Sequence, residues 1–167
     1  MTTPLPSGVE AGWLAESPAD GTLPAHAERA VTLTLDTGQV QPGEHRLRLL
    51  AVSDDPQYPQ VYLPLTVTVL PAPTMGRLTG FVTGVCRQGI AARVAARDFP
   101  ATVAAPGTGH YTLWLDEGEH EVRAALASGD RFISHTVAVH ITAQGTTVQD
   151  FGLPWCGLYL PLTLRGM

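Results

Sequence analysis

The most constraining feature of this sequence is a strict two-residue alternation of apolar side chains, bounded by turns rich in glycine and proline. The clearest run has apolar residues at positions 61, 63, 65, 67 and 69. Successive side chains of a β-strand point to opposite faces, so this period predicts a strand with one buried face. Pro64 lies within the run and has no N–H to donate, which predicts a position at a sheet edge or a bulge. The first 70 residues contain no sustained helical period, and an all-β fold is therefore expected.

Two further segments of the first 70 residues alternate in the same way. They are Val31–Leu35 and Arg46–Leu49, and the arginines of the second segment are expected to face outward. A dense turn signal, Ser53-Asp54-Asp55-Pro56, separates the second strand from the third. The stretch Pro71-Ala72-Pro73-Thr74 then breaks the pattern and predicts a short, stiff linker.

A second strand-rich block follows, and its first strand is expected over Leu78–Val85, bent or bulged at its glycines. Tyr111–Leu115 alternates next, then an acidic turn from Asp116 to Glu119 leads to Val122 and Ala124 on the same face. This arrangement predicts a β-hairpin. Phe132–Ile141 and Thr146–Leu153 are expected to supply two more strands, and the block predicts a small sandwich of about seven strands.

These patterns predict two tandem all-β blocks. The expected parts are a block with three strands over 1–70, a Pro-rich linker over 71–75, a complete sandwich over 76–153 and an apolar tail over 154–167. One short echo links the two blocks, Gly43-Glu44-His45-Arg46-Leu47-Arg48 against Gly118-Glu119-His120-Glu121-Val122-Arg123. Because the residue spacing around the two segments differs, the echo is interpreted as two hairpins that use the same kind of turn and not as a repeat.

Composition excludes several classes of function. The 10 basic residues are all arginine, and the chain has neither lysine nor asparagine. Lysine chemistry such as a Schiff base or a P-loop is therefore excluded, and so is N-glycosylation. A net charge of −5 with scattered arginines argues against a nucleic-acid partner. No apolar run approaches the ~20 residues of a membrane helix, so no membrane span is expected, and the first residues lack a signal-peptide core.

The first block resembles the immunoglobulin-like repeats of bacterial secreted multidomain proteins. The resemblance covers residues 13 to 70, with His45 where an aromatic residue is usual and Asp54 where asparagine is usual. The matching residues are Trp13-Leu14, Ser17-Pro18, Gly21-Thr22-Leu23, Pro42-Gly43-Glu44-His45, Asp54-Asp55-Pro56 and Leu63-Pro64-Leu65-Thr66-Val67. In that family several strands precede the Trp-Leu segment. The resemblance therefore implies that residues 1–70 form a partial, N-terminally incomplete immunoglobulin-like β-sandwich, the first of two tandem β-sandwich domains.

The second block resembles the carboxypeptidase regulatory-like domain, a transthyretin-like β-sandwich. The resemblance covers nearly the whole block, with His120 in place of the customary aromatic residue. The matching residues are Gly80-Phe81-Val82-Thr83-Gly84, Ile90 to Val94, Gly109-His110-Tyr111-Thr112-Leu113-Trp114-Leu115, Gly118 and Thr147-Val148-Gln149-Asp150-Phe151-Gly152-Leu153. In this family the domain is an accessory module without an active site of its own.

Together the two resemblances imply a non-catalytic accessory or structural module of a larger bacterial protein, such as a secreted subtilisin-like peptidase. The implied partners are neighbouring domains of that parent protein, and the implied location is extracellular or at the cell surface. The signal peptide would then lie upstream of this chain or be lost. No cofactor is implied, and an enzyme activity of the chain itself is not expected.

Cys86 and Cys156 flank the second block, and a disulfide between them is expected in the related secreted domains. Such a bond would close a long loop, stabilise the domain by on the order of 4 kcal/mol and favour an oxidising compartment. Two unpaired thiols are the alternative. A metal site is not expected, because the two cysteines lack the CxxC spacing of zinc ligands.

The remaining polar residues give little support to catalysis. The six histidines lack the close spacing of zinc ligands, and no serine lies in a Gly-x-Ser-x-Gly elbow. Asp116, Glu117, Glu119 and Glu121 cluster at a turn that is expected to be solvated. That cluster, or Asp54-Asp55, is also a candidate for a weak Ca²⁺ ion, although neither has EF-hand spacing.

The aromatic residues support a second hypothesis, a carbohydrate-binding or surface-adhesion module. Trp114 has the opposite parity to Tyr111, Leu113 and Leu115 and is expected to face outward. Tyr58 and Tyr62 flank another turn, and the three residues are candidate ligands for a polysaccharide. An outward Trp114 could equally pack against another part of the chain.

The C-terminal tail is apolar and too short to span a membrane. Its Leu-Pro-Leu string resembles the C-terminal ends of some bacterial secreted proteins and is not a cell-wall sorting signal. It could equally add an edge strand to a sheet of this chain or of a neighbour. The sequence leaves these alternatives open.

Overall fold

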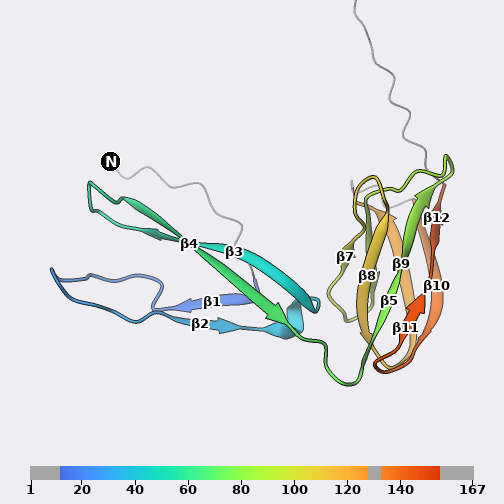
Figure 1. Cartoon of the computed structure of the whole chain (residues 1–167), viewed down its shortest axis with the longest axis horizontal. Helices are drawn as coiled ribbons and strands as arrows, with labels where there is room; N and C mark the ends of the chain where they lie inside the picture. The colour runs from blue at the N-terminus through green and yellow to red at the C-terminus, as the bar shows by residue number, and fades with distance from the viewer. Residues whose placement is uncertain (1–11, 128–132, 155–167) are drawn as a thin grey trace, which may run out of the picture. The chain divides into compact units, whose positions relative to one another are not determined.

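The computed structural model describes residues 12–127 and 133–154 (Figure 1). The chain divides into two compact units, Met1–Leu70 (unit 1) and Pro71–Met167 (unit 2). The described residues contain twelve strands, one short 3₁₀ turn at Thr37–Gln39 and no α-helix, which confirms the all-β prediction. No helix among them is long and apolar enough to cross a membrane.

Unit 1 consists of two two-stranded antiparallel sheets. In the first sheet Leu14 pairs with Leu35, and in the second Leu47 pairs with Leu65. The strands are β1 (Leu14–Ser17), β2 (Thr32–Leu35), β3 (Gly43–Val52) and β4 (Gln60–Val69). The segments Val31–Leu35, Arg46–Leu49 and 61–69 therefore form strands as predicted, and Arg46 and Arg48 are exposed. The structure adds β1, which the alternation did not reveal.

Unit 2 is a β-sandwich of two four-stranded sheets (Figure 1). One sheet has the order β10-β9-β6-β7. In the other, β5 lies in the middle, with β8 antiparallel along one edge and β11 and β12 parallel along the opposite edge. The strands are β5 (Met75–Gly84), β6 (Ala92–Ala96), β7 (Thr102–Val103), β8 (His110–Asp116), β9 (Gly118–Leu126), β10 (Ser134–Ile141), β11 (Thr146–Val148) and β12 (Phe151–Leu153).

An apolar core fills the space between the two sheets of unit 2. Every fully buried side chain among the described residues of this unit is apolar or is the ring of Tyr111. The largest of these are Tyr111, Phe151, Leu78, Leu113, Leu115, Ile141 and Leu153. The inward positions alternate along each strand, as the period-two pattern predicts.

The predicted hairpin between Tyr111 and Ala124 is wrong. β8 pairs with β5, whereas β9 pairs with β6 and β10, so the turn at Asp116–Gly118 carries the chain from one sheet to the other. Val122 and Ala124 do face the same core as Tyr111, but from the opposite layer. Two strands of one sheet and two strands in facing layers have the same alternation, which is why the pattern could not separate them.

The predicted strand Thr146–Leu153 is divided in two. β11 and β12 both run parallel to β5, and Gln149 and Asp150 interrupt the ladder between them. The predicted strand Phe132–Ile141 is described from Ile133 onward, and its ladder begins at Ser134. The stretch Pro71–Thr74 contains no strand residue, and β5 begins directly after it.

Candidate functional site

The structure places the candidate ligand-binding residues in different surroundings. Tyr58 lies in the turn between β3 and β4, and Tyr62 lies near the start of β4, so both belong to the tip of one hairpin. Trp114 lies in unit 2, opposite Arg77 on the outer face of β5 and β8. As its parity predicts, it lies on the opposite face of β8 from the buried Leu113 and Leu115, and it is half-buried there.

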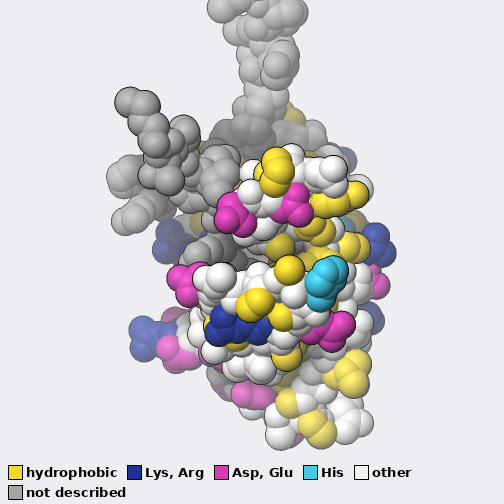
Figure 2. All heavy atoms as spheres, turned by 90° about the vertical axis from the view of Figure 1, so that its left-hand side faces the viewer, with side chains coloured by type: hydrophobic (Ala, Val, Ile, Leu, Met, Phe, Trp, Pro, Cys, Tyr) yellow, Lys and Arg dark blue, Asp and Glu magenta, His cyan; other side chains and the backbone are white. Residues whose placement is uncertain are grey.

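The hairpin tip holds the two tyrosines in exposed positions on a well-connected turn. The Ser53 hydroxyl donates to the Tyr58 carbonyl oxygen at 2.8 Å, and the Gln57 N–H donates to the Asp55 carboxylate at 2.7 Å. Tyr58 is 65% exposed and Tyr62 is 59% exposed. Figure 2 looks onto the left-hand side of Figure 1 and shows hydrophobic side chains lying in the open between acidic ones. The tip therefore offers apolar rings to solvent on a preformed loop.

The same hairpin carries an extended apolar face, made of the odd-numbered residues of β3 and β4. Its cross-strand pairs include Leu47 with Leu65, Leu49 with Leu63 and Ala51 with Val61. Exposure is greater in the half of β4 nearer the tip, where Val61 is 42% and Leu63 is 51% exposed, than at its other end, where Val69 is 8% exposed. The opposite face carries Glu44, Arg46, Arg48 and the threonines of β4, but Leu50 and Tyr62 pair on it near the tip.

An incomplete first domain is expected to leave one edge unpaired and half of its apolar face exposed, but alternation alone did not indicate which strands would carry that exposed face. The strict alternation of β4 implied that its odd-numbered side chains would be buried, yet among the described residues of unit 1 the one buried apolar side chain is Val69. The signal that was present is the run Leu49-Leu50-Ala51-Val52, which is apolar at consecutive positions and therefore on both faces of β3. A strand end that is apolar on both faces is typical of a contact surface.

A histidine secures the start of β3 in unit 1. The Nε2 atom of His45 lies 2.8 Å from the Gln41 carbonyl oxygen, four residues upstream. Its ring meets Trp13 edge-on, with centroids 5.4 Å apart. Trp13 directly precedes β1, and the contact therefore joins the two sheets of unit 1 at one end of the apolar face.

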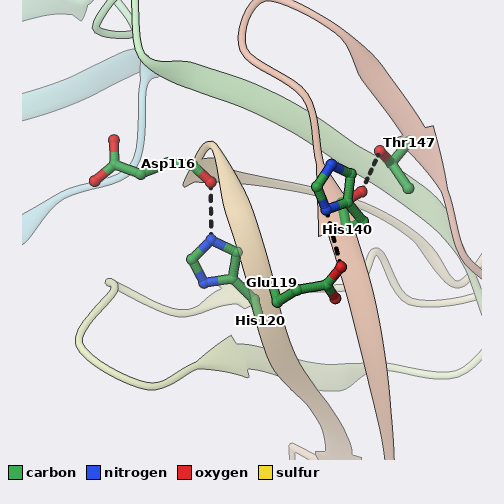
Figure 3. A network of polar contacts seen from close by, with 5 residues as sticks. All are labelled: Asp116, Glu119, His120, His140 and Thr147. Carbon is green, nitrogen blue, oxygen red and sulfur yellow. Dashed lines mark hydrogen bonds and ion pairs between the residues drawn. The ribbon is translucent and has the colours of Figure 1, made fainter.

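Histidine 120 has the equivalent environment in unit 2 (Figure 3). Its Nε2 atom lies 2.8 Å from the Asp116 carbonyl oxygen, again four residues upstream, and its ring meets Phe99 edge-on at 5.3 Å. The echo in the sequence thus corresponds to the same local contacts in both units. Both histidines hold the chain where it enters a strand, a structural use that resembles the tyrosine corner of immunoglobulin-like folds.

The other polar contacts of this region are exposed. His140 Nδ1 lies 2.9 Å from a Glu119 carboxylate oxygen, and the Thr147 hydroxyl donates to the His140 carbonyl oxygen at 3.1 Å (Figure 3). The side chains of His140 and Glu119 are 63% and 74% exposed. In the parts of the chain that the structure describes, no three histidine, cysteine or acidic side chains come together in a way that could hold a metal ion. The acidic turn at Asp116–Glu119 is solvent-exposed apart from Gly118.

A polar cluster within unit 2 contains several residues that carry the resemblance to the carboxypeptidase regulatory-like domain. The Tyr111 hydroxyl donates to the Gln149 carbonyl oxygen at 2.6 Å, and the Phe81 N–H donates to the Asp150 carboxylate at 2.8 Å. These two bonds occupy the gap between β11 and β12. A Cβ atom at position 80 would overlap the Gln149 carbonyl oxygen, so only glycine allows the two backbones to approach this closely.

Burial raises the pKa of the Tyr111 hydroxyl well above its ordinary range, and the negative charge of Asp150 adds to the shift. A tyrosine with this shift holds its proton and acts as a hydrogen-bond donor. The cluster has the chemistry of a structural joint, because its donors and acceptors are occupied by the backbone of β5 and of the β11–β12 junction.

Cys86 lies in the exposed turn that follows β5, next to Arg87. Backbone bonds from Gly84 to Gln88 at 3.0 Å and from Arg87 to Gly84 at 2.9 Å close this turn. The predicted partner Cys156 lies outside the described residues, and the disulfide stays a prediction.

One shallow depression lies over the middle of the β3–β4 sheet. It has a volume of ≈ 430 Å³ and is lined by Arg46, Leu47, Arg48, Pro64, Leu65 and Thr66. Its polar lining consists of two guanidinium groups and a hydroxyl, and it offers no acid–base pair.

The comparisons with known proteins leave the family of this chain open. No family model and no curated protein matches the sequence. Among solved structures the chain is similar to the Bacillus anthracis TIE protein, at 13% identity and a TM-score of 0.36. That alignment covers 90% of this chain and 33% of the other, so the chain spans a third of the length of that protein. A likeness this distant says nothing about ligands or activity.

Proposed function

We propose that this chain is a non-catalytic module of a secreted multidomain bacterial protein, such as a subtilisin-like peptidase, in which it spaces or docks neighbouring domains. In unit 2, residues that carry the resemblance to the carboxypeptidase regulatory-like domain make contacts that hold the sandwich together. Tyr111 and Asp150 bond to backbone groups, and Phe151 is fully buried. Residues that are consumed by structural contacts in this way are not available for catalysis.

The apolar face of the β3–β4 sheet is the observation that carries the docking role. Leu63 and Val61 lie about half exposed at its centre and tip, and Leu50 and Tyr62 extend the apolar surface to the other side. Removing apolar surface from water is favourable by roughly 25 cal/mol per Å². A face of this kind is therefore stabilised when a neighbouring polypeptide covers it.

Secretion agrees with the proposed disulfide between Cys86 and Cys156. Disulfides persist in oxidising compartments and are rare where glutathione keeps thiols reduced. Reaction of the denatured protein with a thiol reagent, with and without prior reduction, measures the bond directly. Two thiols that appear only after reduction are expected, and two thiols without reduction would contradict the proposal.

The cellular test is the size and location of the native species. An antibody against unit 2, combined with peptide mapping, is applied to the producing cells and to their medium. We expect a secreted species larger than 17.7 kDa, whose peptides extend beyond this sequence. A free-standing species of 17.7 kDa that is retained inside the cell would contradict both the accessory role and secretion.

Polysaccharide binding is a second candidate, favoured by the exposure of Tyr58 and Tyr62 on the ordered hairpin turn. Aromatic rings in solvent are the usual platform for sugars on β-sandwich modules. Co-sedimentation with insoluble polysaccharides compares the wild type with Tyr62→Ala and Trp114→Ala. Binding that is lost in these variants supports this candidate, and absence of binding by the wild type removes it.

A further inference from the structure

The β3–β4 sheet has one edge that is open to another strand. Within the described residues β3 pairs with β4 alone, so each strand leaves one side of its backbone without a ladder. The edge of β4 carries Pro64, which has no N–H and blocks continuous pairing. β3 has ten residues and no proline, and its free edge is therefore the receptive one.

A segment near the C-terminus of this chain repeats part of the β4 sequence. Residues 158–164 read Leu-Tyr-Leu-Pro-Leu-Thr-Leu, and residues 61–67 of β4 read Val-Tyr-Leu-Pro-Leu-Thr-Val. The two differ only at their first and last positions, where leucine replaces valine. In β4 this pattern aligns Leu63 and Leu65 with Leu49 and Leu47 of β3. The leucines of 158–164 have the same spacing, although the segment itself lies outside the described residues.

We propose that segment 158–164 of one copy adds to the free edge of β3 in a second copy, with its leucines extending the apolar face. The proposal rests on the docking role given above and identifies segment 158–164 as the polypeptide that docks on the β3–β4 sheet. Main-chain hydrogen bonds would supply affinity, and the alternate leucines would supply register. Pro161 would end the enlarged sheet, because its missing N–H leaves the new outer edge unable to continue the ladder.

The topology of unit 2 favours a second copy over the same chain. β12 ends where Leu153 pairs with Gly84, at the far end of the ten-residue strand β5 from Met75 and the linker. That strand is roughly 30 Å long. Residues 154–157 cannot span more than about 14 Å. The described part of unit 2 therefore ends, at Pro154, away from the linker, and residues 154–157 are too short to return the chain to it.

An interface of this kind joins unlike surfaces, so each copy donates one segment and accepts one. Heterologous contacts that do not close into a ring give open chains that lengthen with concentration. The full-length protein is therefore expected to increase in weight-average mass across a concentration series followed by light scattering.

Two matched pairs of variants test the two surfaces. Leu162→Lys places a charge among the leucines of the segment, and Thr163→Lys places it on the other parity. Leu49→Lys places a charge on the apolar face of β3, and Glu44→Lys places it on the opposite, polar face of the same strand. Leu162→Lys and Leu49→Lys are expected to remain monomeric at every concentration, while the two controls associate like the wild type.

Mixing the two monomeric variants gives the sharpest outcome. Leu49→Lys retains an intact segment, and Leu162→Lys retains an intact edge, so together they are expected to form a 1:1 complex of twice 17.7 kDa that grows no further. This result does not require β3 to be folded in the Leu49→Lys chain, which acts only as donor. A wild type that stays monomeric, association that survives Leu162→Lys, or a mixture that forms no complex would each overturn the proposal. None of these outcomes bears on secretion as part of a larger protein, which the cellular test decides separately.

Discussion

The two units of this chain are built from the same kind of strand, but they differ in how much of their apolar surface they bury. Unit 2 encloses Leu78, Leu113 and Phe151 completely between two four-stranded sheets. Unit 1 has two strands in each described sheet and leaves Leu63 half exposed. Alternation therefore specifies which face of a strand is apolar. The number of strands in the facing layer decides whether that face is covered.

The contacts of His45 and of His120 form two similar histidine corners, one in each unit. They show that the difference in burial between the units does not arise from local structure. His45 and His120 have carbonyl contacts of the same length and edge-on aromatic contacts of nearly the same separation. One corner lies in the sparse unit and the other in the complete sandwich. A short sequence can therefore specify its own turn, while burial depends on strands from elsewhere.

The largest difference between the units is expected from truncating matched leucines. Leu113→Ala removes a fully buried side chain and should lower the free energy of unfolding of unit 2 by about 2–5 kcal/mol. Leu63→Ala, at a side chain that is 51% exposed, should lower that of unit 1 by about 1 kcal/mol or less. Urea denaturation, followed separately in each unit by hydrogen exchange, measures both. Equal losses would mean that unit 1 has a core of its own.

The Tyr111 joint should give the next largest effect. Tyr111→Phe keeps the ring in the core and removes the donor to the Gln149 carbonyl oxygen, at a cost of about 1–2 kcal/mol. Chemical denaturation of the full chain detects the change in unit 2. A neutral substitution would show that this bond does not hold β11 and β12 against β5.

The same tyrosine predicts a loss of stability in alkali. The folded state holds the Tyr111 proton more tightly than the unfolded chain, whose tyrosines titrate near about 10. Above that pH the unfolded state binds fewer protons, so the stability of unit 2 falls as pH rises, by up to about 1.4 kcal/mol per pH unit. The wild-type dependence between pH 9 and 11.5 is expected to be steeper than that of Tyr111→Phe. Identical slopes would contradict the assignment.

The histidine corners should give the smallest effects and the closest match between units. His45→Ala and His120→Ala each remove one carbonyl contact and one aromatic edge contact, and each should cost its own unit about 1 kcal/mol. His140→Ala is the control, because its contact with the Glu119 carboxylate is exposed and should contribute about 0.5 kcal/mol or less. A loss of stability in only one of the two variants would contradict the claim that the two histidines play the same local role.

Much of the secondary structure could be predicted from the sequence, because alternation and turn residues act locally. The runs around Leu47, Leu65 and Leu113 became strands with the expected parity. Pairing could not be predicted in the same way. The expected hairpin through Asp116 joins two layers instead, since either arrangement buries the same side chains.

The candidate site was harder to predict than the fold for a similar reason. Exposure of Tyr58 follows from its place in a turn, and the outward parity of Trp114 follows from alternation. The exposed apolar face does not follow from either, because a period-two pattern implies a cover that only tertiary structure can supply. The role of Gly80 likewise depends on Gln149, a residue distant in sequence.

Native-state hydrogen exchange on the dilute full-length chain tests the central claim most directly, namely that unit 2 supports itself whereas unit 1 leaves an apolar face in need of a partner. The account predicts that amides of β5, β8 and β9 exchange only through global unfolding of their sandwich. Amides of β3 and β4 should exchange at least about 100-fold faster, and their exchange should slow as the protein is concentrated. Equal protection of both units in dilute solution would contradict the account.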